Sequence, residues 1–170
     1  DLNGDELIND DDKYRYKKPS PDYFIGISNN LNIGEFYLNF GARASIGNYV
    51  YNNVQTDAGF LNRLYWSTNY LSNIHRSGVD LNVKDQANLT FSDHFVTRAD
   101  FLRFDHITVG YNLNKLLGQN VNIYLTMQNA FLVTPYEGMD PEIGNGIDNN
   151  IYPRSKTFVI GLNANFNTKK

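Results

Sequence analysis

Apolar and polar residues alternate strictly along several stretches of the chain, most clearly in the last one, TFVIGLNANF. One face of this stretch carries only apolar side chains: Phe158, Ile160, Leu162, Ala164 and Phe166. The intervening positions are small or polar, apart from Val159. Alternation with a period of two over about ten residues predicts a β-strand that is buried or lipid-facing on one side only.

The same alternation recurs upstream and predicts an all-β, antiparallel fold. The predicted strands cover about 22–33, 36–47, 101–113, 121–131 and 156–166. Their connections alternate in length, because 34–35 and 114–120 are short, whereas 48–100 and 131–155 are long. Loops as long as the last two are uncommon inside a compact soluble domain.

Short turns on one side and long loops on the other are typical of a transmembrane β-barrel, with about ten alternating residues per strand. A soluble β-sandwich, in which two apolar sheet faces meet, remains the alternative, because it shows the same alternation within each strand. The predicted strands are too few to close a barrel, and an open edge in lipid would leave backbone groups unpaired. We therefore expect the chain to be a C-terminal fragment of a larger barrel.

Composition excludes several classes of function. The chain has no cysteine, so it has neither disulfides nor a thiolate metal site, and its three histidines lack the spacing of zinc ligands. A net charge of −3 gives no basic footprint for nucleic acid. No apolar run approaches the roughly 20 residues of a membrane helix, and no signal-peptide pattern is present. No set of nucleophile, base and orienting residue is evident, so we do not expect an enzyme.

The opening stretch, DLNGDELINDDD, matches the ligand spacing of an EF-hand-type calcium loop. The candidate ligands are Asp1, Asn3, Asp5, the Leu7 carbonyl, Asn9 and Asp12. Two positions depart from the pattern, since Glu6 stands where glycine is usual and Asp12 is shorter than the usual glutamate. The prediction is therefore a Ca²⁺ site or, as the alternative, a solvated acidic turn.

Aromatic residues with asparagine, aspartate and glutamine gather in the long connection 48–100. Tyr65, Trp66 and Tyr70 are candidates for contact with a ligand or with a partner that closes over the loops. Packing of these rings against neighbouring loops is the alternative. Arg43 and His106 fall on the polar face of their predicted strands, where a wet lumen would accept them without a dedicated role.

Four segments resemble the C-terminal barrel region of the SusC/RagA family of TonB-dependent transporters, which are outer-membrane proteins of Bacteroidetes. They are DLNGDELIND, FLRFDHITVGYNL, VNIYLTMQNAFLVTPYEGMDPEI and GIDNNIYPRSKTFVIGLNANF. The most specific pieces are Tyr136-x-Gly138-x-Asp140-Pro141-Glu142 and Tyr152-Pro153-Arg154. The resemblance extends over nearly the whole chain, in the right order.

The resemblance implies that these are the last five strands of a barrel of about 22 strands, whose plug and TonB box lie outside this sequence. It also implies extracellular loops at 1–21, 48–100 and 131–155. The implied partners are the remaining barrel and plug, TonB, outer-membrane lipid and a SusD-like surface lipoprotein that acts as a lid, but no nucleic acid. The implied function is import of oligosaccharides or, in some members, peptides. A soluble calcium-stabilised β-sandwich that recognises glycans is the alternative function.

Overall fold

The computed structural model describes residues 1–170 except 7–8, 66–69, 87–90, 117–118 and 166–170. Its largest element is a five-stranded antiparallel sheet with the strand order β1-β2-β5-β6-β8. The strands are β1 (Tyr23–Ile33), β2 (Phe36–Ile46), β5 (Phe101–Leu116), β6 (Gln119–Val133) and β8 (Thr157–Asn165). The predicted antiparallel sheet is thus present, and β5 and β6 run further toward their shared turn than the alternation predicts.

The long connections contain regular structure that the alternation did not predict. A second sheet with the order β4-β3-β7 forms there, and β3 and β7 run parallel. Its strands are β3 (Tyr49–Asn52), β4 (Val96–Arg98) and β7 (Ile147–Asp148). The helices are η1 (Asp10–Asp12), α1 (Asn53–Ala58), η2 (Leu61–Tyr65), α2 (Arg76–Asp80) and η4 (Asp93–Phe95). Elements of so few residues show no readable alternation of polarity, so the sequence alone predicts loops at these positions.

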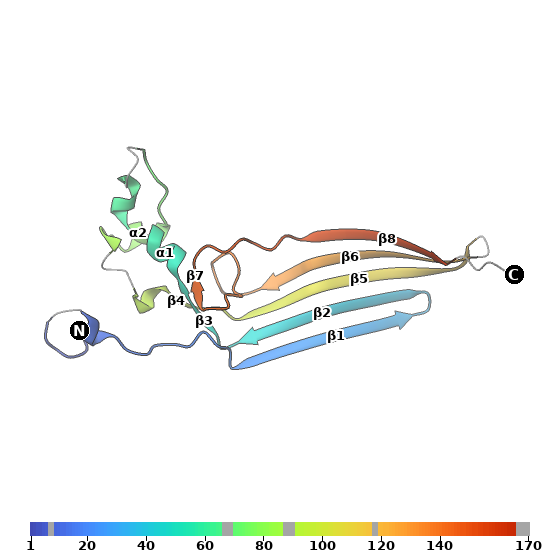
Figure 1. Ribbon diagram of the computed structural model, residues 1–170, viewed down its shortest axis with the longest axis horizontal. Helices are drawn as coiled ribbons and strands as arrows, with labels where there is room; N and C mark the ends of the chain where they lie inside the picture. The colour runs from blue at the N-terminus through green and yellow to red at the C-terminus, as the bar shows by residue number, and fades with distance from the viewer. Residues whose placement is uncertain (7–8, 66–69, 87–90, 117–118, 166–170) are drawn as a thin grey trace.

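The described parts of the long connections lie at one end of the five-stranded sheet, and the turn between β1 and β2 and the last described residues of β8 lie at the other (Figure 1). We call β3, β4, β7, α1 and α2, with the connections between them, the loop module. No helix in the described residues is both long and apolar enough to cross a membrane.

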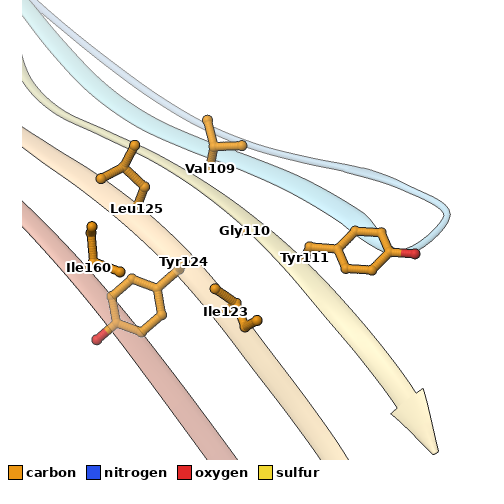
Figure 2. Close-up of a pocket in the computed structure, with 7 residues that line it drawn as sticks. All are labelled: Val109, Gly110, Tyr111, Ile123, Tyr124, Leu125 and Ile160. Atoms are coloured by element: carbon orange, nitrogen blue, oxygen red, sulfur yellow. The ribbon is translucent and has the colours of Figure 1, made fainter. Parts of the chain in front are cut away.

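One face of the five-stranded sheet is apolar and exposed. The cross-strand register aligns one apolar residue from every strand into a single row, namely Leu31, Leu38, Val109, Leu125 and Ile160. Ile160 on β8 is 80% exposed. A shallow apolar hollow of about 220 Å³ lies on β5, β6 and β8 and includes three members of this row (Figure 2). The small sheet sits at the end of the large one rather than across this face (Figure 1).

Buried apolar clusters lie in the loop module instead. One is formed by Val50, Ala99 and Tyr136, with Ile143 packed against it. The other contains Phe60 and Phe95. Burial of apolar side chains therefore stabilises the loop module directly, whereas the apolar face of the large sheet needs an apolar environment from outside the described chain.

Candidate functional site

The opposite face of the large sheet is polar, and its side chains bond to one another across the strands. Three hydrogen bonds of 2.8 Å join His106 with Asn39, Thr108 with Thr126, and Asn122 with Asn112. The Tyr37 hydroxyl donates a further bond of 3.2 Å to Asn122, which places its side chain across β5. His106 takes part in this network, and Arg43 faces the same side. Polar positions of the alternation on β2, β5 and β6 are thus hydrogen-bonded to one another across the strands.

Two tyrosine rings on this face lie directly over glycines of the neighbouring strand. Tyr37 is opposite Gly110, and Tyr124 is opposite Gly161. A Cβ atom built on either glycine would lie 2.1 Å from the tyrosine Cζ, so the ring would have to move to admit a side chain. Figure 2 shows the Tyr124 ring extending from β6 toward β8, the strand that carries Gly161. Only a residue without a Cβ fits under each ring.

Three arginines and three carboxylates meet on the polar face near the loop end of the sheet. This ionic cluster comprises Arg43, Arg103, Arg154, Asp105, Asp140 and Glu142. Nitrogen–oxygen distances are 2.6 Å from Arg103 to Asp140, 2.8 Å from Arg154 to Glu142 and 3.0 Å from Arg43 to Asp105. Arg43 also contacts Glu142 with both terminal nitrogens. The formal charges of the six side chains cancel.

The centre of the ionic cluster is removed from water. Arg103 is 1% exposed and Asp140 is 3% exposed. Buried charges persist in proteins when they are paired and hydrogen-bonded, as these two are. The alternation placed Arg43 on the polar face but gave it no partner, and it missed the other five members. These five residues lie in the FLRFDH, DPE and YPR motifs. The motifs indicate the family, but they do not show which residues contact one another.

Irregular register in β5 and β6 supplies two polar side chains that bond to the arginines, Asp105 to Arg43 and Asn129 to Arg103. The pairing of β5 with β2 skips Asp105, and its pairing with β6 skips Asn129. Asn129 has a backbone φ of 49°, and its side chain accepts a 2.8 Å bond from Arg103 and donates to the Arg154 carbonyl. A β-bulge turns extra side chains out of strict alternation, so these residues reach groups that a regular ladder would not.

The predicted contact residues of the 48–100 connection are only partly placed by the structure. Tyr65 and Tyr70 are 75% and 79% exposed, so their rings are available to a partner or ligand. Trp66 lies outside the described residues. Other aromatic residues of this connection, such as Phe60 and Phe95, pack inside the loop module. Contact by Tyr65, Trp66 and Tyr70 stays a prediction.

The opening loop is closed by bonds between its acidic side chains and its own backbone. The Asp1 carboxylate accepts from the amides of Gly4 and Glu6, at 2.6 and 2.9 Å. Asn3 bonds similarly to Asp5, with its amide oxygen 3.0 Å from the Asp5 nitrogen. Glu6 adopts a φ of 64°, the left-handed conformation for which glycine is usual at this position.

The far end of the loop folds back onto its start. The Asp12 carboxylate accepts from the amides of Leu2 and Asn9, at 2.7 and 2.8 Å. These bonds, the one from Asn9 first, hold the pKa of Asp12 below its usual range. Leu7 lies outside the described residues. Within the described ranges, no three acidic or histidine side chains are grouped so as to hold a metal ion. The calcium site stays a prediction, which calorimetric titration of the loop with Ca²⁺ would test.

Comparison with known proteins gives clear relatives. The chain is 38% identical over 179 residues to the TonB-dependent receptor SusC of Bacteroides thetaiotaomicron, covering 98% of this chain and 17% of the receptor. It is 29% identical over 191 residues to the TonB-dependent receptor P3 of Formosa agariphila, covering 98% of this chain and 18% of that protein. No protein-family model matches the chain.

Solved structures agree with these relatives at the level of fold. A structure of the RagAB peptide importer in the closed-closed state has a TM-score of 0.72 and 24% identity, covering 92% of this chain and 18% of that one. A structure of the RagAB peptide transporter has a TM-score of 0.67 and 25% identity, covering 86% and 17%. This chain therefore spans less than a fifth of the proteins that it matches.

The fold and the matches define a segment of a TonB-dependent receptor, a class of outer-membrane proteins. Within that class the chain belongs to the SusC/RagA family, whose members are transporters rather than enzymes. The predicted family and the predicted outer-membrane location are thus confirmed.

Proposed function

We propose that this chain forms the last five strands and part of the extracellular mouth of a transmembrane barrel of about 22 strands. The observation that carries the proposal is the contrast between the two faces of the sheet. One face presents an apolar row that crosses all five strands, with Leu38 half-buried and the other four members exposed, and the other face carries hydrogen-bonded polar side chains. Lipid-facing and lumen-facing residues alternate in this way along the strands of outer-membrane barrels.

The two edges of the sheet support a larger barrel. β1 and β8 are the outermost strands, and each pairs on one side only within the described residues. Unpaired backbone groups in hydrocarbon cost several kcal/mol each, so a membrane sheet must be closed. Further strands of the same receptor would supply the missing partners. A plug and a TonB box at the other end of the receptor complete the proposed importer.

The positions of the long connections support an orientation of the sheet in which its loop end faces the outside of the cell. The segments 1–21, 48–100 and 131–155 gather at one end of the sheet, where the loop module has buried apolar clusters of its own. Extracellular loops of outer-membrane barrels are the long ones, and periplasmic turns are short. The loop module would therefore stand outside the cell, above the membrane.

The proposed cargo is an oligosaccharide or a peptide, and the proposed partner is a SusD-like lipoprotein that covers the mouth. Similarity to SusC and to the RagAB peptide importer supports this class of importer without choosing between the two cargoes. Exposed aromatic rings at the loop end, such as Tyr65, Tyr70 and Tyr152, suit contact with such a lid. A receptor–lipoprotein structure in which neither 48–100 nor 131–155 touches the lipoprotein would contradict the lid contact.

A pair of adjacent substitutions in β8 tests the membrane orientation in the full-length receptor. Ile160→Arg places a charge on the apolar face near the middle of the strand, and Val159→Arg places the same charge on the polar face. We expect Ile160→Arg to destabilise the barrel by about 2–4 kcal/mol, and Val159→Arg to be tolerated because the lumen is wet. The measurement is the amount of folded receptor in the outer-membrane fraction.

Two outcomes would count against the proposed orientation. Equal losses from both variants would show that the two faces of β8 are not in different solvents. Recovery of the intact wild-type product from the soluble fraction would favour the glycan-binding β-sandwich instead, because its apolar face would then be covered by protein.

A further inference from the structure

The segment 134–156, which connects β6 to β8, does not stay above the two strands that it joins. Through Asp140 and Glu142 it contacts Arg103 of β5 and Arg43 of β2. In the sheet order β1-β2-β5-β6-β8, these strands lie on the side of β6 away from β8. We call residues 134–156 the strap, because they fold back across the polar face.

The strap is fixed to the sheet at both sides of its path. Asp140 and Glu142 bond to the arginines of β5 and β2, and Arg154 returns to Glu142 at 2.8 Å. Asn129 in the irregular part of β6 holds the end of the strap by donating to the carbonyls of Arg154 and Ser155. These contacts with the sheet depend on charged or amide side chains, whereas Tyr136 and Ile143 of the strap pack against Val50 and Ala99 of the loop module.

The middle of the strap is anchored to the loop module. β7 pairs with β3, and the amide of Tyr51 donates to the Gly146 carbonyl at 2.9 Å. Tyr136 packs with Val50 and Ala99 in the buried cluster of the loop module, and within the strap its hydroxyl donates to the buried Asp148 carboxylate at 2.6 Å. The strap therefore links the wall of the sheet to the loop module, and its position depends on both.

Two exposed apolar side chains are placed by these anchors. Met139, which is 61% exposed, directly precedes Asp140, and Tyr152, which is 93% exposed, lies two positions before Arg154. Residues beside a fixed carboxylate or guanidinium have little freedom to move while the pairs hold. A shift of the ionic cluster would therefore shift both side chains.

We infer that Arg103, Asp140 and Glu142 are positioning residues of an electrostatic latch that holds the strap inward over the lumen. The inference rests on the proposed barrel, in which the polar face lines the lumen. Because Arg103 and Asp140 are almost fully buried, neutralising Asp140 leaves a charge that the closed strap does not compensate. The variant relieves this charge by lifting the strap, which lets water reach Arg103.

The test compares Asp140→Asn with Glu137→Gln in the full-length receptor in outer-membrane vesicles. Glu137 is exposed in the same strap, so its variant removes the same charge without touching the ionic cluster. The readout is the rate of cleavage after Arg154 by an arginine-specific protease, relative to cleavage after Arg76 in the loop module. Cleavage of a transiently opened segment follows the population of its open form.

We expect Asp140→Asn to raise the relative cleavage rate after Arg154 by about tenfold or more, and Glu137→Gln to leave it unchanged. Equal rates for wild type and Asp140→Asn would overturn the latch, as would equal acceleration by both variants. A general loss of structure would accelerate cleavage after Arg76 as well, so a uniform increase at both sites also counts against a local latch.

A milder variant decides the matter if Asp140→Asn receptor fails to assemble. Glu142→Gln changes a side chain that is 27% exposed and contacts three arginines, so it weakens the latch without burying an unpaired charge as deeply. Selective acceleration after Arg154 supports the latch, and an unchanged rate overturns it. Fractionation of the wild-type receptor tests the proposed barrel separately, because a latched strap in a soluble protein would still respond to these variants.

Discussion

At the scale of single residues, the tightest fit in the described chain is between tyrosine rings and glycines on the polar face. Alternation of polarity places Tyr124 and Gly161 on that face, but it does not show that they are cross-strand neighbours. That depends on the register between β6 and β8, which turn geometry and packing determine together. The tyrosine ring covers the backbone where the glycine lacks a side chain. Each tyrosine–glycine pair therefore favours one register between its two strands.

Gly161→Ala tests this fit, with Gly26→Ala as the matched control. A Cβ at Gly161 would meet the Tyr124 ring at 2.1 Å, whereas no atom of the described residues lies within 4 Å of a Cβ at Gly26 on the same face of β1. We expect Gly161→Ala to lower the free energy of unfolding by about 1–3 kcal/mol. Gly26→Ala should stay within about 0.5 kcal/mol of wild type. Both free energies are measured by unfolding the receptor in urea and following the folded fraction by gel electrophoresis, in which the heat-unfolded receptor migrates more slowly. Equal effects of the two substitutions would show that the Tyr124 ring moves away freely.

At the scale of elements, the sequence reveals strands better than it reveals contacts. The five long strands are readable because only one of their faces is apolar, so polarity repeats with a period of two. β3, β4 and β7 have too few residues for a period, and β7 joins a parallel pair with β3 from far along the chain. The ionic cluster escaped prediction for a related reason. Arg43 and Glu142 are 99 positions apart, and the bulge at Asp105 breaks the alternation that would have aligned it.

Tyr136 connects two elements, because it lies in a buried cluster of the loop module and its hydroxyl bonds to Asp148 of β7. Burial, together with its bond to Asp148, raises the pKa of the Tyr136 hydroxyl. A raised pKa stabilises the fold at pH values below the unfolded value of about 10, and this contribution is lost as pH rises above it. Tyr136→Phe should cost about 1–3 kcal/mol at neutral pH, since a buried carboxylate oxygen loses its donor.

Tyr152→Phe is the control, because Tyr152 is 93% exposed and makes no hydrogen bond among those found in the described residues. Proteolysis of the loop module in increasing urea reports its local stability in the intact receptor. Wild type should lose protection above about pH 10, and Tyr136→Phe should show a smaller change over the same range. If the two tyrosine variants behave alike, the bond to Asp148 does not stabilise the module.

At the scale of the whole molecule, the chain divides into two parts that differ in where their apolar side chains lie. The five-stranded sheet exposes its apolar side chains, and the loop module buries its own. A domain that folded alone in water would bring these two tendencies together in one core. Their separation agrees with the proposed barrel wall in a bilayer and loop module in water, which the strap and the ionic cluster connect.

This separation has a consequence for hydrogen exchange. Local opening in proteins occurs in cooperative units, or foldons, whose stabilities differ widely within one molecule. The loop module, with two small apolar clusters and short strands, forms one such unit, and the paired strands β2, β5 and β6 form another. Amides of the first unit should exchange by brief opening events that leave the second fully protected. The loop module would thus unfold and refold many times while the strands β2, β5 and β6 remain paired.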